Sequence, residues 1–198
     1  MVAGTPTRLL VSSSIWLIGV GGGVFALWQY ESEPGKDQGP ALRWPDQSEL
    51  PAPQGRPALV VFAHPKCPCS RATLAELGRL LARTGDPVRT HVVFVRPPGS
   101  KPGWEQTALW ETAKSIPGTT VAVDSNGAEA ARFGAKTSGY TLLYGADGRL
   151  QFSGGITGAR GHAGDNPGED AVISLITTGR SDRVHTPVFG CTLLNEPT

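Results

Sequence analysis

Two cysteines separated by one proline are the residues of this chain with the clearest capacity for chemistry. Cys67, Pro68 and Cys69 follow an apolar run at 58–63 and precede leucines that recur at helical spacing. We expect Cys67 at the N-cap of that helix and Pro68 at its first position, where a fixed φ and a missing N–H cost nothing. The free N–H groups and the positive dipole end of the helix stabilise a thiolate, and Lys66 adds a cation. The segment therefore predicts a nucleophilic cysteine.

A third cysteine and two histidines extend the candidate site. Cys191 lies in the C-terminal tail, and three interpretations of it stay open: a thiol that resolves a mixed disulfide, a metal ligand, or a structural tether. His64 ends the apolar run, where we expect it to pack or to cap a turn. His162 lies in a glycine-rich loop over 154–168. Long loops without regular structure are often functional, so a ligand or proton-shuttle role for His162 stays open beside an inert one.

The elements that must position these residues alternate between strands and helices. Strands are expected over 58–63, 90–95, 119–123, 141–144 and 150–152. Helices are expected from residue 67 to a stop at 85–87, over 104–115, over 127–133 and over 169–178. This alternation implies right-handed crossovers and an α/β fold in which helices flank a central mixed sheet.

The cysteine pair in this context resembles the thioredoxin superfamily. A buried strand, then two cysteines at a helix start with proline just before the second, resembles that family's redox motif, and the hairpin over 141–152 resembles its closing hairpin. The resemblance covers residues 56–178. It implies a thioredoxin-like fold, exchange with protein thiols or disulfides, and no dissociable cofactor. The chain is also similar to the membrane-anchored bacterial thioredoxin-like proteins called RedB-type.

Two departures from the family pattern affect the expected chemistry. The family usually has two residues between its cysteines, whereas this chain has one, and a disulfide across one residue closes a strained, more oxidising ring. The family also has a cis-proline before the hairpin, where this chain has Tyr140 after Gly139. A cis bond without proline costs about 2.5–4 kcal/mol, so we expect a trans bond. Loss of that proline makes a metal site at the thiols easier to form. The peroxiredoxin signature is absent, which disfavours a peroxidase.

The N-terminus predicts a membrane span. Residues 9–30 contain no charged side chain and are long enough to cross a bilayer core. Arg8 precedes this stretch and Glu31 and Glu33 follow it, so the positive-inside rule leaves the rest of the chain on the periplasmic or extracytoplasmic side. The alternative is a signal peptide cleaved near 24–26. Both interpretations export the domain to an oxidising compartment, where cysteine pairs persist.

These signals divide the chain into a transmembrane anchor over 1–30, a proline-rich linker over 31–56 with little capacity to form a core, and a thioredoxin-like domain with a C-terminal tail over 57–198. Lys plus Arg number 18 and Asp plus Glu 17, for a net charge of +1. A nucleic-acid-binding domain usually carries a clear basic excess, so we expect no nucleic-acid partner.

Three functions compete for the cysteines. The first is an exported, membrane-anchored thiol–disulfide oxidoreductase in which Cys67, expected as the more exposed thiol, attacks a protein disulfide and Cys69 or Cys191 resolves the product. The second is a copper or zinc binding or delivery protein that uses the thiolates with Cys191 or a histidine such as His162. The third is a binding scaffold that kept the fold and lost turnover, with a structural disulfide or inert thiols.

Overall fold

The computed structural model describes residues 5–36, 38–85 and 88–194, which divide into two compact units. The first unit ends at Glu33 and the second begins at Pro34. Residues 1–4 of the predicted anchor, 86 and 87 of the predicted helix stop, and 195–198 of the predicted tail lie outside the described residues. The second unit holds every strand that the described residues form.

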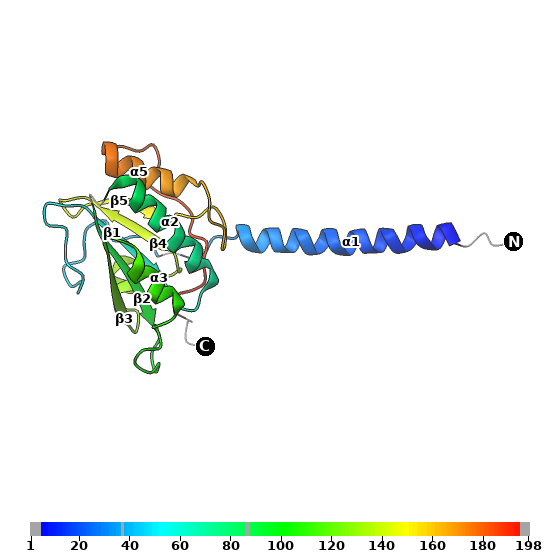
Figure 1. Cartoon of the computed structure of the whole chain (residues 1–198), viewed down its shortest axis with the longest axis horizontal. Helices are drawn as coiled ribbons and strands as arrows, with labels where there is room; N and C mark the ends of the chain where they lie inside the picture. Colours follow the sequence, from blue (N-terminus) through cyan, green and yellow to red (C-terminus); the bar gives the residue numbers. More distant parts are fainter. Residues whose placement is uncertain (1–4, 37, 86–87, 195–198) are drawn as a thin grey trace. The chain divides into compact units, whose positions relative to one another are not determined.

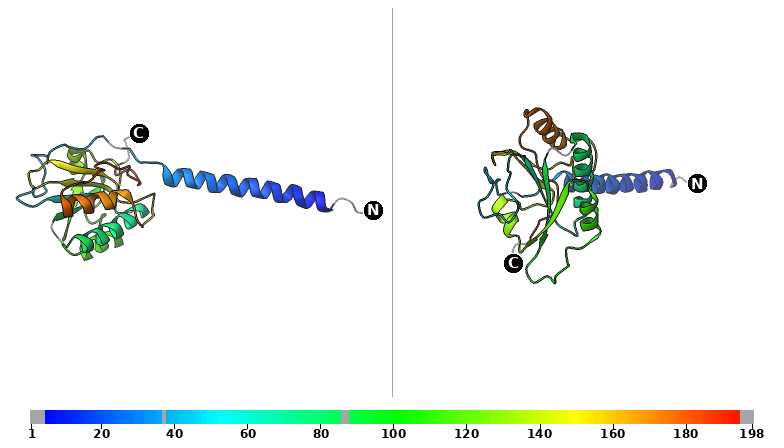
Figure 2. Two further views of the ribbon diagram at one scale, coloured as in Figure 1. Left: turned by 90° about the horizontal axis from the view of Figure 1, so that it is seen from above. Right: turned by 60° about the vertical axis from the view of Figure 1, so that its left-hand side comes forward.

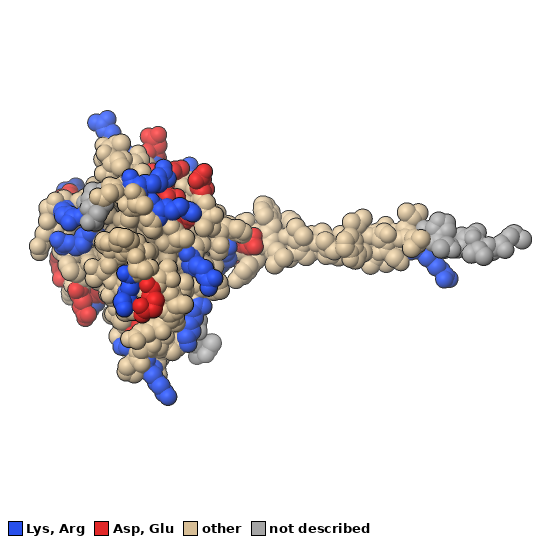
Figure 3. Space-filling view, in the orientation of Figure 1, with Lys and Arg blue, Asp and Glu red and all other residues tan. Residues whose placement is uncertain are grey.

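The first unit is one helix, α1 (Thr5–Ser32), of 28 residues. Its segment Thr7–Ser32 contains an 18-residue window with a mean hydropathy of 1.8 and is long and apolar enough to cross a membrane. Figure 3 shows this helix almost without Lys, Arg, Asp or Glu side chains along its length. A signal sequence near an N-terminus has the same length and composition, so anchoring by α1 stays a prediction.

The second unit is built on one five-stranded mixed sheet, as predicted (Figure 1). The strand order is β3-β2-β1-β4-β5, with β1 central. β1 pairs in parallel with β2 and antiparallel with β4, while β2–β3 is parallel and β4–β5 antiparallel. The strands are β1 (Ala58–Ala63), β2 (Arg89–Arg96), β3 (Thr119–Ser125), β4 (Tyr140–Tyr144) and β5 (Leu150–Gly154). Every residue of β1 is buried, because both faces of the sheet are covered.

Helices cover the two faces of the sheet unequally (Figure 2). α2 (Pro68–Thr84), α3 (Ala108–Ser115) and α5 (Pro167–Thr178) pack their apolar side chains into one core with alternate residues of the strands. The short helix α4 (Ala128–Phe133) packs into a second core on the opposite face. Asn166 caps α5 as predicted, since its side chain accepts hydrogen bonds from the backbone N–H groups of Gly168 and Glu169.

The prediction that residues 31–56 have little capacity to form a core is wrong for two of them. Trp44 and Leu50 are buried in the core on the α4 face. The Trp44 ring lies edge-on to Phe133 at 5.1 Å and to Tyr144 at 5.3 Å between ring centroids. The backbone N–H of Trp44 donates to the backbone carbonyl of Gly148 at 2.8 Å. The prolines keep this segment from forming a helix or strand. It is nevertheless buried in part, because α4 alone does not cover the sheet face against which it packs, and Trp44 and Leu50 fill the remaining area.

The third predicted helix begins later than its sequence suggests. We expected 104–115, whereas α3 begins at Ala108 with Thr107 as its N-cap. Gly103 has a positive φ of 82°, which interrupts any helical path before it, and the Thr107 hydroxyl donates to Pro65 O at 2.9 Å instead of capping α3. The loop before α3 is thereby tied to the turn that precedes the cysteines.

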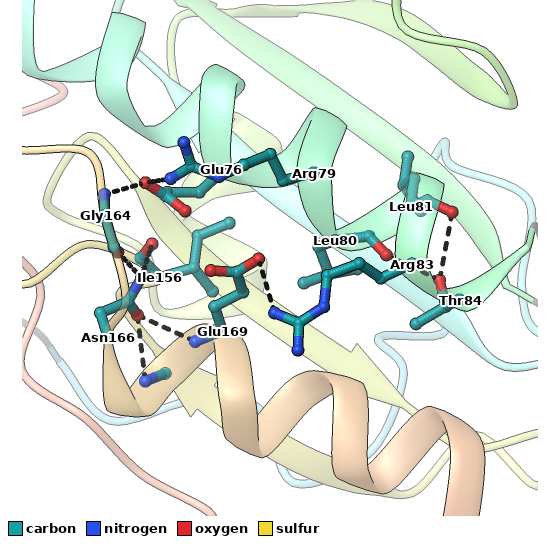
Figure 4. Close-up of polar contacts among 11 residues, drawn as sticks. Glu76, Arg79, Leu80, Leu81, Arg83, Thr84, Ile156, Gly164, Asn166 and Glu169 are labelled. Carbon is teal, nitrogen blue, oxygen red and sulfur yellow. Dashed lines mark hydrogen bonds and ion pairs between the residues drawn. The ribbon is translucent and has the colours of Figure 1, made fainter.

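A buried pair of glutamates joins α2 to α5 (Figure 4). Glu76 is fully buried, and its Oε1 accepts from the N–H of Gly164 at 2.6 Å and from the guanidinium of Arg79. Glu169 is 3% exposed and faces Arg83 at 3.6 Å. Burial raises the pKa of Glu169 to about 7, and Glu76 beside it acts in the same direction, against the two arginines. The ion pair between Arg83 and Glu169 therefore links α2 to α5, and it includes a carboxyl group that titrates near neutral pH.

We expect Glu169→Gln to flatten the pH dependence of stability. The folded-state pKa of Glu169, about 7, lies above its ordinary 4.5. Its contribution is therefore complete below pH 4.5 and is lost as the pH rises through about 7. The wild type should lose on the order of 1–2 kcal/mol of unfolding free energy across this range, and the variant much less. Urea unfolding at pH 5 and pH 8 measures the difference; Glu111→Gln, at an exposed site, is the matched control. An unchanged loss in Glu169→Gln would contradict the assignment.

Candidate functional site

The start of α2 has the predicted arrangement. Cys67 is the N-cap, with extended backbone angles of φ −90° and ψ 121°, and Pro68 opens the helix. Cys69 follows in the first turn. No side-chain hydrogen bond caps this helix end, so its first N–H groups are available to a neighbouring anion. Among the atoms near them, the sulfur of Cys67 is placed to take that role.

The surroundings of Cys67 favour its thiolate. Burial raises the pKa of the Cys67 thiol, but the nearby Cys191 thiol and the backbone N–H groups of Cys191, Ser70 and Cys69 outweigh burial, so the net pKa is lowered. The prediction that Cys67 is the more exposed thiol is wrong: it is 2% exposed, whereas Cys69 is partly exposed. The reason is that the C-terminal tail, which carries Cys191, contacts this sulfur.

The other two thiols are held in their protonated form. Burial raises the pKa of Cys69, and the charge on Cys67 raises it further. Burial and the same neighbour raise the pKa of Cys191 to about 12. Arg160 opposes both shifts through its positive charge. The three sulfurs lie within 4.8 Å of one another, and Cys67 is the thiol of the three that ionises first.

The tail reaches this place by pairing with the chain just before β4. The N–H of Ser138 donates to Cys191 O, and the N–H of Leu193 donates to Lys136 O, both at 2.8 Å. Thr137 and Thr192 form an antiparallel bridge between them. The two segments therefore form a short antiparallel ladder beside the thiols, although residues 191–193 belong to no helix or strand of the sheet.

Two further contacts fix the tail next to Cys191. Gly190 lies so close to the backbone of Ser138 that a Cβ at this position would be 1.9 Å from its carbonyl oxygen. The guanidinium of Arg160 donates to Gly190 O. A glycine is thus required at 190 for the close approach, and Arg160 comes from the glycine-rich loop that the sequence singled out only for His162.

A hydroxyl network lies under the cysteines. The Ser70 hydroxyl donates to His64 O at 3.0 Å and lies 2.8 Å from the Ser138 hydroxyl, whose oxygen accepts from the His64 N–H at 2.9 Å. This network joins the end of β1, the first turn of α2 and the segment that the tail pairs with. The expected trans bond before Tyr140 is confirmed, because the described residues contain no cis peptide bond.

His64 caps the turn before the cysteines, as expected. Its Nδ1 accepts from the N–H of Lys66 at 3.2 Å, and its ring meets Trp104 edge-on at 5.5 Å. Burial and the charge of Lys66 lower the pKa of His64, so the ring is neutral at pH 7. The Lys66 ammonium lies 4.3 Å from the centre of the Trp104 ring. His64, Lys66 and Trp104 therefore pack together beside the turn that leads into Cys67.

The residues that could bind a soft metal ion are the three cysteines themselves. Among the described His, Cys, Asp and Glu residues, they form the group with metal-compatible spacing, and His162 is exposed and outside it. Sequence reasoning found all three cysteines but missed Arg160, Ser70 and Ser138. No spacing or periodicity connects these to the cysteines, because the fold brings them together from separate segments.

We expect Cys191→Ala to raise the pKa of the Cys67 thiol. The substitution removes the S–H group that donates to the Cys67 sulfur and leaves burial, which acts in the opposite direction, in place. Thiolate absorbance at 240 nm, followed over pH in the wild type and the variant, measures the change. A Cys67 titration at the same pH in both proteins would contradict the assignment of Cys191 as the donor.

No protein-family model matches the chain, and no match is found among curated proteins. Among solved structures, a hypothetical protein from Sinorhizobium meliloti aligns with a TM-score of 0.62 and 16% identity, over 81% of this chain and 97% of that one. An uncharacterized conserved protein from Geobacillus kaustophilus aligns with a TM-score of 0.60 and 16% identity, over 84% of this chain and 94% of its own.

A third solved structure, a secreted disulfide oxidoreductase from Mycobacterium tuberculosis, aligns with a TM-score of 0.43 and 20% identity, over 63% of this chain and 82% of that one. Identities this low carry no activity or substrate to the present chain, and the RedB-type assignment stays a prediction. The strand order, the helix that begins at the cysteines and the two alignments above 0.5 together give this chain a thioredoxin-like α/β fold.

Proposed function

We propose that this protein is a thiol–disulfide oxidoreductase in which Cys67 attacks the disulfide of a partner protein. The observation that carries the proposal is the place of Cys67 as the N-cap of α2, with its sulfur within 4.8 Å of two other sulfurs and beside N–H groups that lower the pKa of its thiol. The thiolate is the reactive form of cysteine, and such surroundings lower the pKa that controls it. A cysteine kept only for packing has no need of donors aimed at its sulfur.

The proposal includes export and attachment to a membrane. Helix α1 supplies the span, and its apolar surface suits a bilayer. An extracytoplasmic domain works where disulfides persist, so its partners would be exported proteins that carry thiols or disulfides. The reaction uses only cysteine sulfurs and needs no dissociable cofactor.

Mixed-disulfide trapping tests the proposal. The Cys69→Ser/Cys191→Ser double variant keeps Cys67 and removes both thiols that can resolve an adduct, so we expect it to accumulate partner proteins joined to Cys67. Non-reducing gels and peptide mapping of the full chain detect them, and the triple variant that also carries Cys67→Ser is the matched control. Equal adduct in both variants would contradict the proposal.

Metal content separates this function from copper or zinc delivery. Protein purified without chelator or reductant should contain no stoichiometric metal, and its thiol count should show one cysteine pair oxidised. Three free thiols with one equivalent of copper or zinc would instead favour a metal-delivery protein, because three sulfurs within 4.8 Å also suit a soft ion.

A further inference from the structure

The three thiols of the site differ in how they are held. Cys67 and Cys69 lie two positions apart at the start of one helix. Cys191 lies far along the chain, in the C-terminal tail that pairs with the segment before β4. The sulfurs of Cys67 and Cys69 lie close to each other, but one residue separates the two cysteines, so a disulfide between them closes a small, strained ring. No such constraint applies to Cys191, whose S–H points at the sulfur of Cys67.

We propose that Cys191 resolves the mixed disulfide on Cys67, so that the oxidised protein carries a Cys67–Cys191 disulfide joining the tail to the start of α2. This inference rests on the proposed function and names the second thiol of the same reaction. The ladder between residues 136–138 and 191–193 positions the attacking sulfur, and the contact of Gly190 with Ser138 sets how closely the tail approaches.

The reaction has two steps. The Cys67 thiolate attacks one sulfur of a partner disulfide, which forms a Cys67–partner disulfide and releases the other partner sulfur as a thiolate. Cys191 then loses its proton to solvent, and its thiolate attacks the Cys67 sulfur, which forms the Cys67–Cys191 disulfide and releases the second partner thiolate. Two electrons pass from the protein's two thiols to the partner disulfide, and each released thiolate takes up a proton.

The electrostatics of the site favour ionisation of Cys191 only after Cys67 has formed the mixed disulfide. The charge and hydrogen bond of Cys67 are among the causes that keep Cys191 protonated, and both disappear once Cys67 is part of a mixed disulfide. The positive charge of Arg160 remains beside Cys191 and favours its thiolate. Cys191 thus donates a hydrogen bond while Cys67 is a thiolate, and its own pKa falls when the adduct has formed, although burial still acts to raise it.

Glutathione disulfide, as the probe, distinguishes the two possible resolving thiols. The reduced full chain in detergent is mixed with the probe, quenched with acid at intervals, and analysed by intact mass and peptide mapping. We expect the Cys67–glutathione adduct to persist at least about tenfold longer in Cys191→Ser than in the wild type or Cys69→Ser. The reason is that Cys69, the intramolecular thiol left in Cys191→Ser, can resolve the adduct only by closing the strained ring with Cys67. The wild type should end with a Cys67–Cys191 crosslink.

The outcomes separate this inference from the proposed function. An adduct that persists in Cys69→Ser but not in Cys191→Ser, with a Cys67–Cys69 crosslink in the wild type, would overturn the role of Cys191 and leave the proposed function standing. Absence of any adduct on Cys67 in all these proteins would overturn both.

A variant of the tail tests the positioning. Gly190→Ala introduces a methyl group that meets the Ser138 carbonyl, so the tail must shift. Resolution of the adduct should slow several-fold and by more than its formation, because resolution needs the Cys191 sulfur itself whereas formation loses only the donors that Cys191 offers to Cys67. General destabilisation would not produce this difference. Gly158→Ala is the matched control, since its Cβ would meet only ordinary contacts. Resolution at the control rate in Gly190→Ala would show that the ladder does not position Cys191.

Discussion

We expect Cys67→Ser to lower the rate of disulfide exchange by at least about 100-fold, because a serine hydroxyl stays protonated at neutral pH and the donors around position 67 then have no anion to stabilise. The other two thiols should not replace it, because burial still raises the pKa of both when the charge of Cys67 is gone. The rate is measured with the full chain on a disulfide-bonded peptide, with loss of the reduced form followed by thiol labelling.

Cys67 is buried, so loss of rate must be separated from loss of fold. Serine is close in size to cysteine, and Cys67→Ala gives a second variant without a new hydroxyl in the site. Thermal unfolding of both should stay near that of the wild type, and Thr112→Ser, at an exposed position on α3, controls for handling. If a folded Cys67→Ser protein kept more than about one tenth of the wild-type exchange rate, the nucleophile would have to be another sulfur.

Trp44→Ala has the largest expected effect on stability. The indole is 9% exposed and lies edge-on to two aromatic rings of the α4-side core. Truncating a buried tryptophan removes its transfer free energy and leaves a cavity, so we expect the unfolding free energy to fall by about 3–5 kcal/mol in urea titrations.

The matched control lies two residues away. Leu42 is 75% exposed, and Leu42→Ala keeps the backbone carbonyl that accepts from the N–H of Leu150. We expect it to change stability by no more than about 0.5 kcal/mol. If Trp44→Ala lowered the unfolding free energy as little as the control does, the segment before β1 would be an extended tether, as its prolines suggest.

The strands and most helices could be predicted because their signals are local. An all-apolar run became β1, leucines at helical spacing became α2, and an Asn-Pro pair became the start of α5. The burial of Trp44 could not be predicted in the same way. Its neighbours are polar and proline-rich, and its partners Phe133 and Tyr144 lie far along the chain. Only the assembled sheet shows a face that lacks a cover.

In the candidate site too, features with a local sequence signal could be predicted and features that depend on distant segments could not. A proline between two cysteines after a buried strand was enough to place Cys67 at a helix start. The exposure of Cys67 was predicted wrongly because the cover comes from the tail, and nothing near Cys191 in the sequence indicates its destination. Arg160 was missed for a related reason: its contact with Gly190 joins two irregular segments that have no periodicity to interpret.

The path of the C-terminal tail has a consequence for how the protein responds to a protease. Residues 182 and 183 are exposed and belong to no helix or strand, and they precede the residues that pair with Ser153, so they offer a protease a place to cut. After such a cut the third sulfur would stay only through noncovalent packing, chiefly of Val188 and Leu193, unless it were bonded to Cys67. Nicked protein would then keep its terminal fragment when oxidised and release it upon reduction.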